Sequence, residues 1–245
     1  MKASGSILIF ILLLPGGYSF TYQNEEKFSL KKLTLVFNHI IANKKLVLDA
    51  LTVNPLGESL SIQKFRYYVS NFSVTNEKGE INKLPIQYFL IDEAIESSKR
   101  IVLTIPDMPI SAISYLLGVD SIQNVSGIQT GSLDPLHGMY WTWNSGYIMA
   151  KLEGVSPVST SVGHRFTYHI GGYKESMKTA KNIELKLSGK SKPIHEIQIT
   201  GNIDCWFKSK TEISIASTPV CHSPGDLAVK IADNYSNLFS IKAIH

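Results

Sequence analysis

Short segments in which apolar and polar residues alternate recur along the chain, and this pattern most restricts the possible folds. Successive side chains of a β-strand point to opposite faces, so an alternating segment is typical of a strand with one buried face. Residues 32–40 show the pattern clearly, with four side chains on one face: Leu33, Leu35, Phe37 and His39. Turn-forming Gly, Pro and Asn residues separate the segments. The chain is therefore predicted to be all-β, a β-sandwich of short antiparallel strands.

The length and spacing of the segments add detail to this prediction. Residues 60–75 are too long for one regular strand, so we expect a bend near Ser70 and Asn71. Residues 182–187 and 194–200 both alternate, and we interpret them as a pair of half-exposed strands. The sandwich should thus contain one bent strand and a late strand pair.

One helix is predicted near the C-terminus. Residues 223–226 are Ser-Pro-Gly-Asp, which supplies a capping serine, a proline at the first helical position and an acidic residue three positions after the cap. Apolar residues then recur at intervals of three and four: Leu227, Ile231, Tyr235 and Leu238. The predicted helix covers residues 227–239 and closes the sandwich.

Residues 1–20 have the pattern of a secretory signal peptide. Lys2 provides a short positive region, residues 7–14 are uninterruptedly apolar, and residues 15–17, Pro-Gly-Gly, end the run. A run this short does not cross a bilayer core of about 30 Å as a helix. The alternative is a buried N-terminal strand. We expect a mature domain over residues 22–245 with no membrane span, located in the periplasm or outside the cell.

The distribution of charged and reactive residues argues against several function classes. The net charge of +4 comes from scattered Lys and Arg residues, with adjacent lysines only at 31–32 and 44–45, whereas nucleic-acid binding requires a clustered basic patch. The sequence contains no G-x-S-x-G, H-E-x-x-H or C-x-x-C motif, and its carboxylates are dispersed. We therefore expect neither nucleic-acid binding nor catalysis by this chain.

Aromatic residues cluster in the segment 140–154, YWTWNSGYIMAKLEG. Trp141 and Trp143 are one residue apart, so in a strand both indoles lie on the same face. The tripeptide 144–146, Asn-Ser-Gly, interrupts the alternation and predicts a bulge or kink. Taken alone, each tryptophan is ordinarily a core or rim residue, and the alternative is a functional surface.

Several segments, in this order and spacing, make the chain resemble the copper-binding MbnP-like family of exported bacterial proteins. They are GVDSIQN (118–124), LDPLHGMYWTWNSGYI (133–148) and YHIGG (168–172). The segments LVFNHI (35–40) and CHSPGDLAVKIADNYSNLFSI (221–241) are similar to the branch of the family that carries WTWNSGY. The resemblance covers nearly the whole chain after the predicted leader.

This resemblance implies a β-sandwich that binds copper outside the cytoplasm and serves in copper acquisition, storage or delivery. In better-known members histidines bind the metal, and a tryptophan oxidised to kynurenine lies at or near it. A dihaem peroxidase-type partner carries out that oxidation. Trp141 and Trp143 are the candidates for the oxidised residue here, and the sequence does not choose between them.

Three histidines are candidate copper ligands, since imidazole suits copper. His169 belongs to the YHIGG motif shared by the wider family, whereas His39 and His222 match only the branch pattern. We expect the three to converge on a single copper ion, although each taken alone is compatible with a structural or solvated histidine. In many members of the family, the asparagine that ends the segment matching GVDSIQN (118–124) is followed by a histidine. In this chain Asn124 is followed by Val125, so a ligand expected at that position is absent.

Two cysteines and a polar loop provide further candidate sites. Outside the cytoplasm Cys205 and Cys221 are able to form a disulfide, which contributes about 3 kcal/mol in the chain-entropy model. Alternatively, Cys221 is a soft copper ligand beside His222. Oxygen-bearing side chains around the loop 121–137 are candidates for a calcium site: Asp120, Asn124 and Asp134.

A second function class is compatible with the same residues. Trp141, Trp143 and nearby tyrosines would form a stacking platform in a carbohydrate-binding or interaction module, because aromatic faces suit the apolar faces of sugars. The position of the histidines separates the two hypotheses. A metal site needs at least two imidazoles close to the indoles, and a sugar platform needs none.

Overall fold

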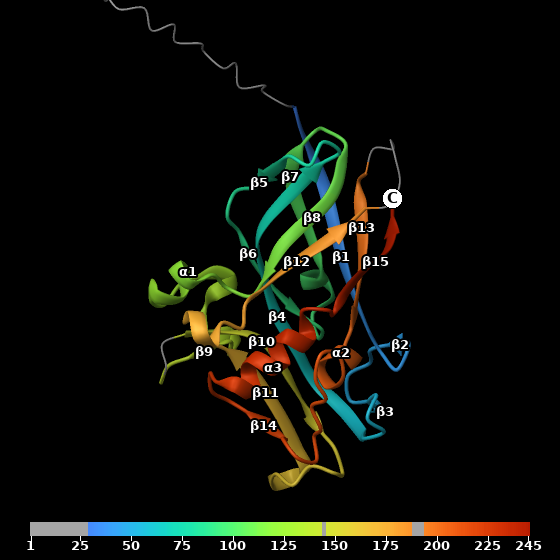
Figure 1. Cartoon of the computed structure of the whole chain (residues 1–245), viewed down its shortest axis with the longest axis vertical. Helices are drawn as coiled ribbons and strands as arrows, with labels where there is room; N and C mark the ends of the chain where they lie inside the picture. Colours follow the sequence, from blue (N-terminus) through green and yellow to red (C-terminus); the bar gives the residue numbers. More distant parts are fainter. Residues whose placement is uncertain (1–28, 144–145, 188–193) are drawn as a thin grey trace, which may run out of the picture.

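The computed structural model describes residues 29–143, 146–187 and 194–245. The predicted signal peptide, residues 1–20, and the predicted domain start at Tyr22 therefore lie outside the described residues. Two β-sheets pack face to face around an extended hydrophobic core (Figure 1), which confirms the prediction of an all-β sandwich. No helix within the described ranges is long and apolar enough to cross a membrane.

The smaller sheet, sheet A, is built around its first strand, with the order β15-β13-β1-β2. Its strands are β1 (Leu30–Ile41), β2 (Lys44–Lys45), β7 (Arg100–Pro106), β13 (Glu196–Asn202) and β15 (Phe239–Ile244). Strand β13 lies along one edge of β1, and β7 and β2 share the other. The β1–β13 pair is parallel, so it departs from the predicted antiparallel arrangement that the other pairs of this sheet follow.

The larger sheet, sheet B, has the order β12-β8-β4-β10-β11-β14, with shorter strands added to β4 and β10. Its strands are β3 (Leu51–Val53), β4 (Ser59–Asn76), β5 (Ile81–Lys83), β6 (Tyr88–Asp92), β8 (Ile110–Leu117), β9 (Tyr140–Trp141), β10 (Gly146–Val155), β11 (Arg165–Gly171), β12 (Lys181–Lys186) and β14 (Val220–Cys221). The edge pair β11–β14 is parallel, and the other pairs are antiparallel.

Short helices occupy the connections between strands. The α-helices are α1 (Ser121–Val125), α2 (Asp204–Phe207) and α3 (Asp226–Tyr235). The single-turn 3-10 helices are η1 (Glu96–Lys99), η2 (Gly131–Leu133), η3 (Pro135–His137), η4 (Val162–His164) and η5 (Glu175–Met177). Helix α1 lies on the same side of the molecule as β9, and α3 lies beside α2 (Figure 1).

The core between the sheets is formed by the faces that alternation predicts. On β1 the predicted inward residues are all buried: Leu33, Leu35, Phe37 and His39. The Phe37 ring meets the Tyr67 ring of β4 edge to face, with the ring centroids 6.2 Å apart. Such aromatic pairs contribute about 0.5–1.5 kcal/mol beyond their buried area. The alternation of β1 thus directs its residues toward sheet B.

Strand β4 contains the predicted bend. Its register with β8 shifts between Ser70 and Ser73, and Asn71 has a φ of 52°. Asn tolerates this left-handed conformation better than most residues. Strand β4 pairs with β10 along residues 61–67 and with β8 along residues 69–76, so the bend lies where the strand exchanges one partner for the other.

The predicted pairing of the two late segments is wrong. Strand β12 pairs with β8 in sheet B, whereas β13 pairs with β1 and β15 in sheet A. Both strands alternate because each buries one face. Alternation specifies which face is buried, but it does not specify which partner strand lies alongside.

The C-terminal helix exists, and its predicted limits need correction. Helix α3 ends at Tyr235, and its N-cap is Gly225 with a φ of 152° and no side-chain hydrogen bond. Ser223 is therefore not the capping residue. Ile231 and Tyr235 are fully buried as predicted, whereas Phe239 begins β15. Phe239 pairs with β13, so strand pairing replaces the last predicted helical turn.

Candidate functional site

The outer face of sheet B at strand β11 carries the first predicted ligand. Phe166, Tyr168 and Ile170 are fully buried in the core between the sheets. Because side chains alternate along a strand, His169 and Gly171 lie on the opposite, outer face. His169 is half-buried there, with 19% of its side chain exposed.

Strand β14 brings a second histidine beside the first. It runs parallel to β11, with Tyr168 opposite Cys221, so His222 follows directly after the pairing (Figure 1). The rings of His169 and His222 stack with their centroids 4.3 Å apart and their planes at 26°. Two of the three predicted histidines therefore share one place on the surface of sheet B.

The two indoles adjoin this histidine pair. A Cβ atom placed on Gly171 would lie 2.6 Å from Cζ3 of Trp141, so the indole packs directly on this glycine, two residues after His169 on the same face. The Trp141 and Trp143 rings lie 5.4 Å apart. The absence of a side chain at Gly171 thus lets the Trp141 indole approach the β11 backbone closely.

Trp141 and Trp143 differ sharply in exposure. Trp141 is 6% exposed, whereas Trp143 is 65% exposed. Trp143 borders a cavity of about 290 Å³ that is also lined by Ser223 and Pro224, the two residues after His222. The exposed indole therefore faces the same surface region as the histidine pair.

The backbone at the indoles differs from the predicted bulge or kink. Strand β9 ends at Trp141, and β10 begins at Gly146 and folds back antiparallel to it, with Trp141 opposite Gly146. The chain thus makes a hairpin. Asn144 and Ser145 of the predicted interruption lie outside the described residues. The Trp141 and Trp143 rings still lie close together, although Trp143 follows the end of β9 and strand alternation does not extend to it.

A carboxylate on β10 holds His169. Oε1 of Glu153 lies 2.7 Å from Nε2 of His169, and Nζ of Lys64 lies 2.9 Å from Oε2. The hydrogen bond from His169 is the largest cause that lowers the pKa of Glu153 to about 2. A carboxylate only accepts hydrogen bonds, so Nε2 of His169 must carry a proton. In the neutral ring the lone pair is then on Nδ1.

The surroundings of the second histidine favour its neutral form. Burial lowers the pKa of His222, and the neighbouring His169 lowers it further. A neutral imidazole has a free nitrogen lone pair, which is the form that binds metal ions. The pair therefore offers two nitrogen donors, one on β11 and one directly after β14.

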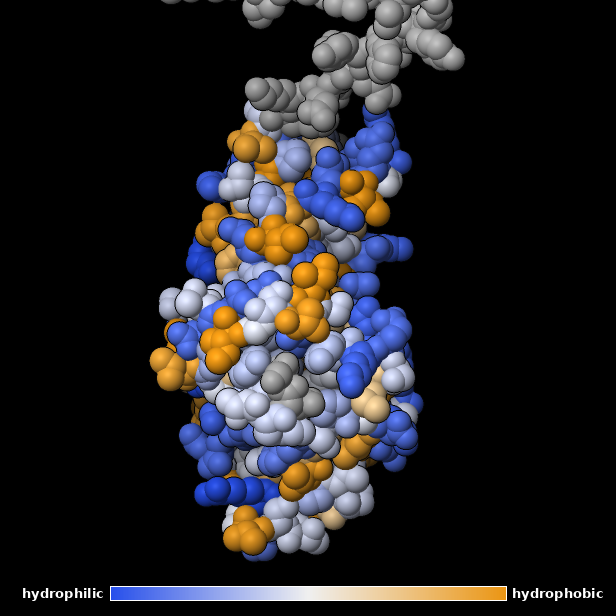
Figure 2. Space-filling model, turned by 90° about the vertical axis from the view of Figure 1, so that its left-hand side faces the viewer, coloured by the Kyte–Doolittle hydropathy of each residue, from blue (hydrophilic) through white to orange (hydrophobic). Residues whose placement is uncertain are grey.

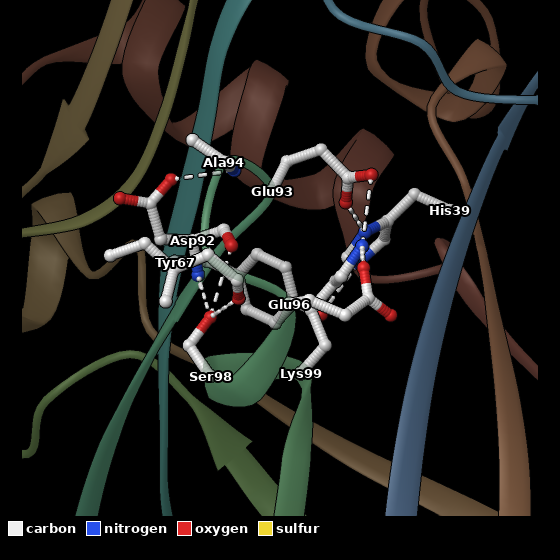
Figure 3. A network of polar contacts seen from close by, with 9 residues as sticks. His39, Tyr67, Asp92, Glu93, Ala94, Glu96, Ser98 and Lys99 are labelled. Carbon is white, nitrogen blue, oxygen red and sulfur yellow. Dashed lines mark hydrogen bonds and ion pairs between the residues drawn. The ribbon is translucent and has the colours of Figure 1, made fainter.

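His39 does not join this site. It lies between the two sheets and is 2% exposed. Its Nδ1 lies 2.5 Å from Oε2 of Glu93, and its Nε2 lies 2.8 Å from Oη of Tyr67 (Figure 3). The expected convergence of His39 with His169 and His222 is therefore not present, because the alternation of β1 turns His39 inward.

The oxygen-bearing residues of the proposed calcium loop are engaged in local structure. Oδ1 of Asp120 accepts from the Gln123 amide at the start of α1, and Oδ1 of Asp134 accepts from the Leu136 amide at η3. Asn124 is buried and accepts from the amide of Tyr147. Among the described residues, no group of three or more His, Cys, Asp and Glu side chains is arranged to hold a metal ion.

The two cysteines are free thiols in the structure. Cys221 is 5% exposed in the core, opposite to the face that carries His222, and burial raises its pKa to about 11. Sγ of Cys205 lies 3.5 Å from the carbonyl oxygen of Asn237. A buried thiol that resists ionisation is poorly suited to the copper-ligand role considered for Cys221.

Glu153 was not identified from the sequence. The signal that it offers is weak: Lys151 and Glu153 are two charged residues, two positions apart, in an otherwise apolar segment. Both lie on the outer face of sheet B, and Nζ of Lys151 contacts Oε1 of Glu153 at 3.8 Å and donates to the carbonyl of Gly138.

Comparisons with known proteins agree with this architecture. The sequence model of the MbnP family matches residues 30–223. The solved structure of MbnP from Methylosinus trichosporium superposes with a TM-score of 0.54 and 13% sequence identity, over 82% of this chain and 87% of that one. At this identity the superposition supports the fold alone. No curated protein matches the chain in sequence.

Proposed function

The chain belongs to the MbnP family, and on that premise we propose that it binds copper outside the cytoplasm for acquisition, storage or delivery. The observation that carries the proposal is the stacked pair of His169 and His222 beside Trp141 and Trp143. Export itself rests on the signal-peptide pattern of residues 1–20.

The donor set fits copper. Imidazole nitrogen is a good ligand for copper, and His169 would present Nδ1 because Nε2 is bonded to Glu153. Carboxylate–histidine pairs of this kind orient metal-binding imidazoles and fix their tautomer. Bound copper would supply one-electron redox chemistry and a positive charge at this surface. The chain would provide two nitrogen ligands and the groups that hold them.

A further donor would come from an oxidised tryptophan. Conversion of an indole to kynurenine opens the ring and creates an amine and a ketone. Trp143 is the better candidate, because it is 65% exposed and lines the cavity beside Ser223 and Pro224. An external oxidising partner, of the dihaem peroxidase type that the resemblance implies, would reach this indole more readily than the buried Trp141. The chain itself performs no turnover in this proposal.

A second candidate function is carbohydrate or protein binding. Its support is the cavity that Trp143 and Tyr173 line together, which is large enough for a small ligand. Figure 2 shows, for the left-hand face of Figure 1, hydrophobic side chains in separate groups among hydrophilic ones. That face thus presents no single broad apolar platform, and the histidine pair has no role in this alternative. Copper binding accounts for more of the site.

The test is metal analysis and intact mass of protein purified from its own host, so that any oxidation of tryptophan has already occurred. We expect a single copper ion per chain and a mass increase located by peptide mapping to Trp143. His169→Ala and His222→Ala should each lose the copper, whereas His195→Ala, an exposed histidine on another strand end, should retain it. Copper bound equally by all variants would refute the site, and absence of copper from the wild type would favour the second candidate.

A further inference from the structure

A buried polar network crosses the core away from the histidine pair. His39 of β1 bonds to Tyr67 of β4 on one side and to Glu93, which follows β6, on the other. Nζ of Lys99 lies 3.2 Å from Oε1 of Glu93 and 2.8 Å from Oε2 of Glu96. Figure 3 shows His39 facing Glu93. Five side chains therefore form one continuous chain of polar contacts.

The hydrogen bonds of this network have a definite direction. Glu93 is 6% exposed, and its Oε1 lies 3.2 Å from Nζ of Lys99, so the two form a buried ion pair. An ionised carboxylate only accepts, so Nδ1 of His39 carries the proton of that bond. In the neutral ring Nε2 is then an acceptor, and Tyr67 donates its phenolic proton to it. The order of donors is Tyr67 to His39 to Glu93.

Burial restricts what this network is able to do. Tyr67 is 1% exposed and His39 2% exposed, so no substrate reaches their polar atoms. Burial raises the pKa of Tyr67 well above its ordinary value, and Glu93 adds to the effect, so loss of the proton alone is strongly disfavoured. Loss of an electron together with the proton leaves a neutral phenoxyl ring, and the proton then rests on an imidazole beside Glu93. That product places no uncompensated charge in the core.

Aromatic residues connect Tyr67 to the exposed indole at the surface. Ring centroids are 5.4 Å apart for Trp143 and Trp141, 5.0 Å for Tyr140 and Tyr147, and 5.9 Å for Tyr147 and Tyr68. The remaining two steps, Trp141 to Tyr140 on β9 and Tyr68 to Tyr67 on β4, join neighbours in the sequence whose side chains lie on opposite faces of the strand, so the electron crosses the backbone there without a ring contact. From the surface inward the order is Trp143, Trp141, Tyr140, Tyr147, Tyr68 and Tyr67. Each of these rings is oxidisable by one electron.

We propose that Tyr67 is a redox-active tyrosine that accepts oxidising equivalents from the surface and uses His39 as its proton acceptor. A high-potential one-electron oxidant outside the chain, such as an oxidised metal complex, takes one electron and is reduced. The O–H bond of Tyr67 breaks and an N–H bond forms at Nε2 of His39, which gives a neutral tyrosyl radical and an imidazolium paired with Glu93. An external one-electron reductant returns the electron, and the proton moves back to Tyr67.

The experiment uses the full chain without copper, so its result is independent of the proposed copper site. Photogenerated tris(bipyridine)ruthenium(III) serves as the oxidant, and electron paramagnetic resonance after freeze-quenching identifies the radical. We expect a tyrosyl signal with one exchangeable hydrogen-bonded proton, visible as a change after transfer to D₂O. Tyr67→Phe should lose this signal.

Tyr115→Phe is the matched control, because Tyr115 is also buried in the same core and its hydroxyl has no hydrogen-bond partner within the described residues. It should retain the signal. Glu93→Gln should lower the radical yield while Tyr67 is intact, since the imidazolium loses its counter-charge. A wild-type signal confined to tryptophan, or a tyrosyl signal that persists in Tyr67→Phe, would overturn the proposal, and so would an unchanged yield in Glu93→Gln.

Discussion

At the scale of single residues, the site depends on how one carboxylate orients one imidazole. Glu153 accepts from Nε2 of His169 and is itself held by Lys64. Replacing Glu153 with Gln keeps the shape and removes the charge, so the imidazole is free to exchange tautomers. We expect copper affinity to fall about 10–100-fold, the usual effect of losing such a partner. Competition titration against a chelator measures it, and Lys186→Met, an exposed change on β12, should leave the affinity unchanged.

The same carboxylate predicts a pH dependence of stability. The pKa of Glu153 is lowered from 4.5 to about 2 in the folded protein. The unfolded chain therefore binds this proton at higher pH than the folded one, so the stabilisation is present above pH 4.5 and is lost as the pH falls toward 2. The full shift corresponds to at most about 3–4 kcal/mol, because one pKa unit is about 1.4 kcal/mol.

Urea unfolding of wild type and Glu153→Gln between those pH values checks this expectation. The difference in unfolding free energy between the two proteins should shrink as the pH falls. A difference that stays constant with pH would show that Glu153 has an ordinary pKa in the folded protein.

At the scale of elements, Gly171 lets strand β11 receive the β9 indole. A Cβ atom at Gly171 would also lie 2.8 Å from the carbonyl oxygen of Tyr147, so a side chain has no room there. Gly171→Ala should destabilise the protein by about 1–3 kcal/mol through overpacking and should displace Trp141. Gly79→Ala is the control, because a Cβ atom at Gly79 would lie in open space. Gly79 has a φ of 85°, so this substitution should lower the unfolding free energy only through backbone strain, by about 1 kcal/mol.

Thermal unfolding followed by tryptophan fluorescence distinguishes the overpacking expected in Gly171→Ala from the backbone strain expected in Gly79→Ala. The emission of the native Gly171→Ala protein should shift because Trp141 moves, whereas the emission of Gly79→Ala should match the wild type. An unshifted spectrum with unchanged stability would mean that the indole does not pack on this glycine.

At the scale of the whole molecule, the polar network of His39 ties sheet A to sheet B. Lys99 is buried and balances the charge of Glu93. Lys99→Met leaves Glu93 buried with His39 as its remaining partner, so we expect a loss of about 3–5 kcal/mol. Lys208→Met removes a lysine from an exposed pair with Glu212 and should change stability by less than about 1 kcal/mol. Chemical denaturation compares the two, and equal small effects would show that the network is not holding the sheets together.

Local sequence patterns specify the kinds of elements in this fold and the faces that they bury. Alternation placed Leu35, Phe37 and His39 on the inner face of β1, because a strand has only two faces. The length of residues 60–75 also predicted the bend at Asn71. These features depend on local backbone geometry, which neighbouring residues are sufficient to specify.

Local patterns do not specify which elements lie side by side, and this becomes visible in the folded structure. Alternation puts His39 on the core face of β1 and His169 on the face of β11 opposite to Phe166 and Tyr168, but it does not specify which strands lie beside either residue. The pairing of β14 with β11 brings His222 to His169, and nothing local to residues 220–222 requires that partner. Glu153 gains its role only because β10 lies next to β11. Strand order depends on the whole set of packed faces, so these contacts appear only when the complete chain has folded.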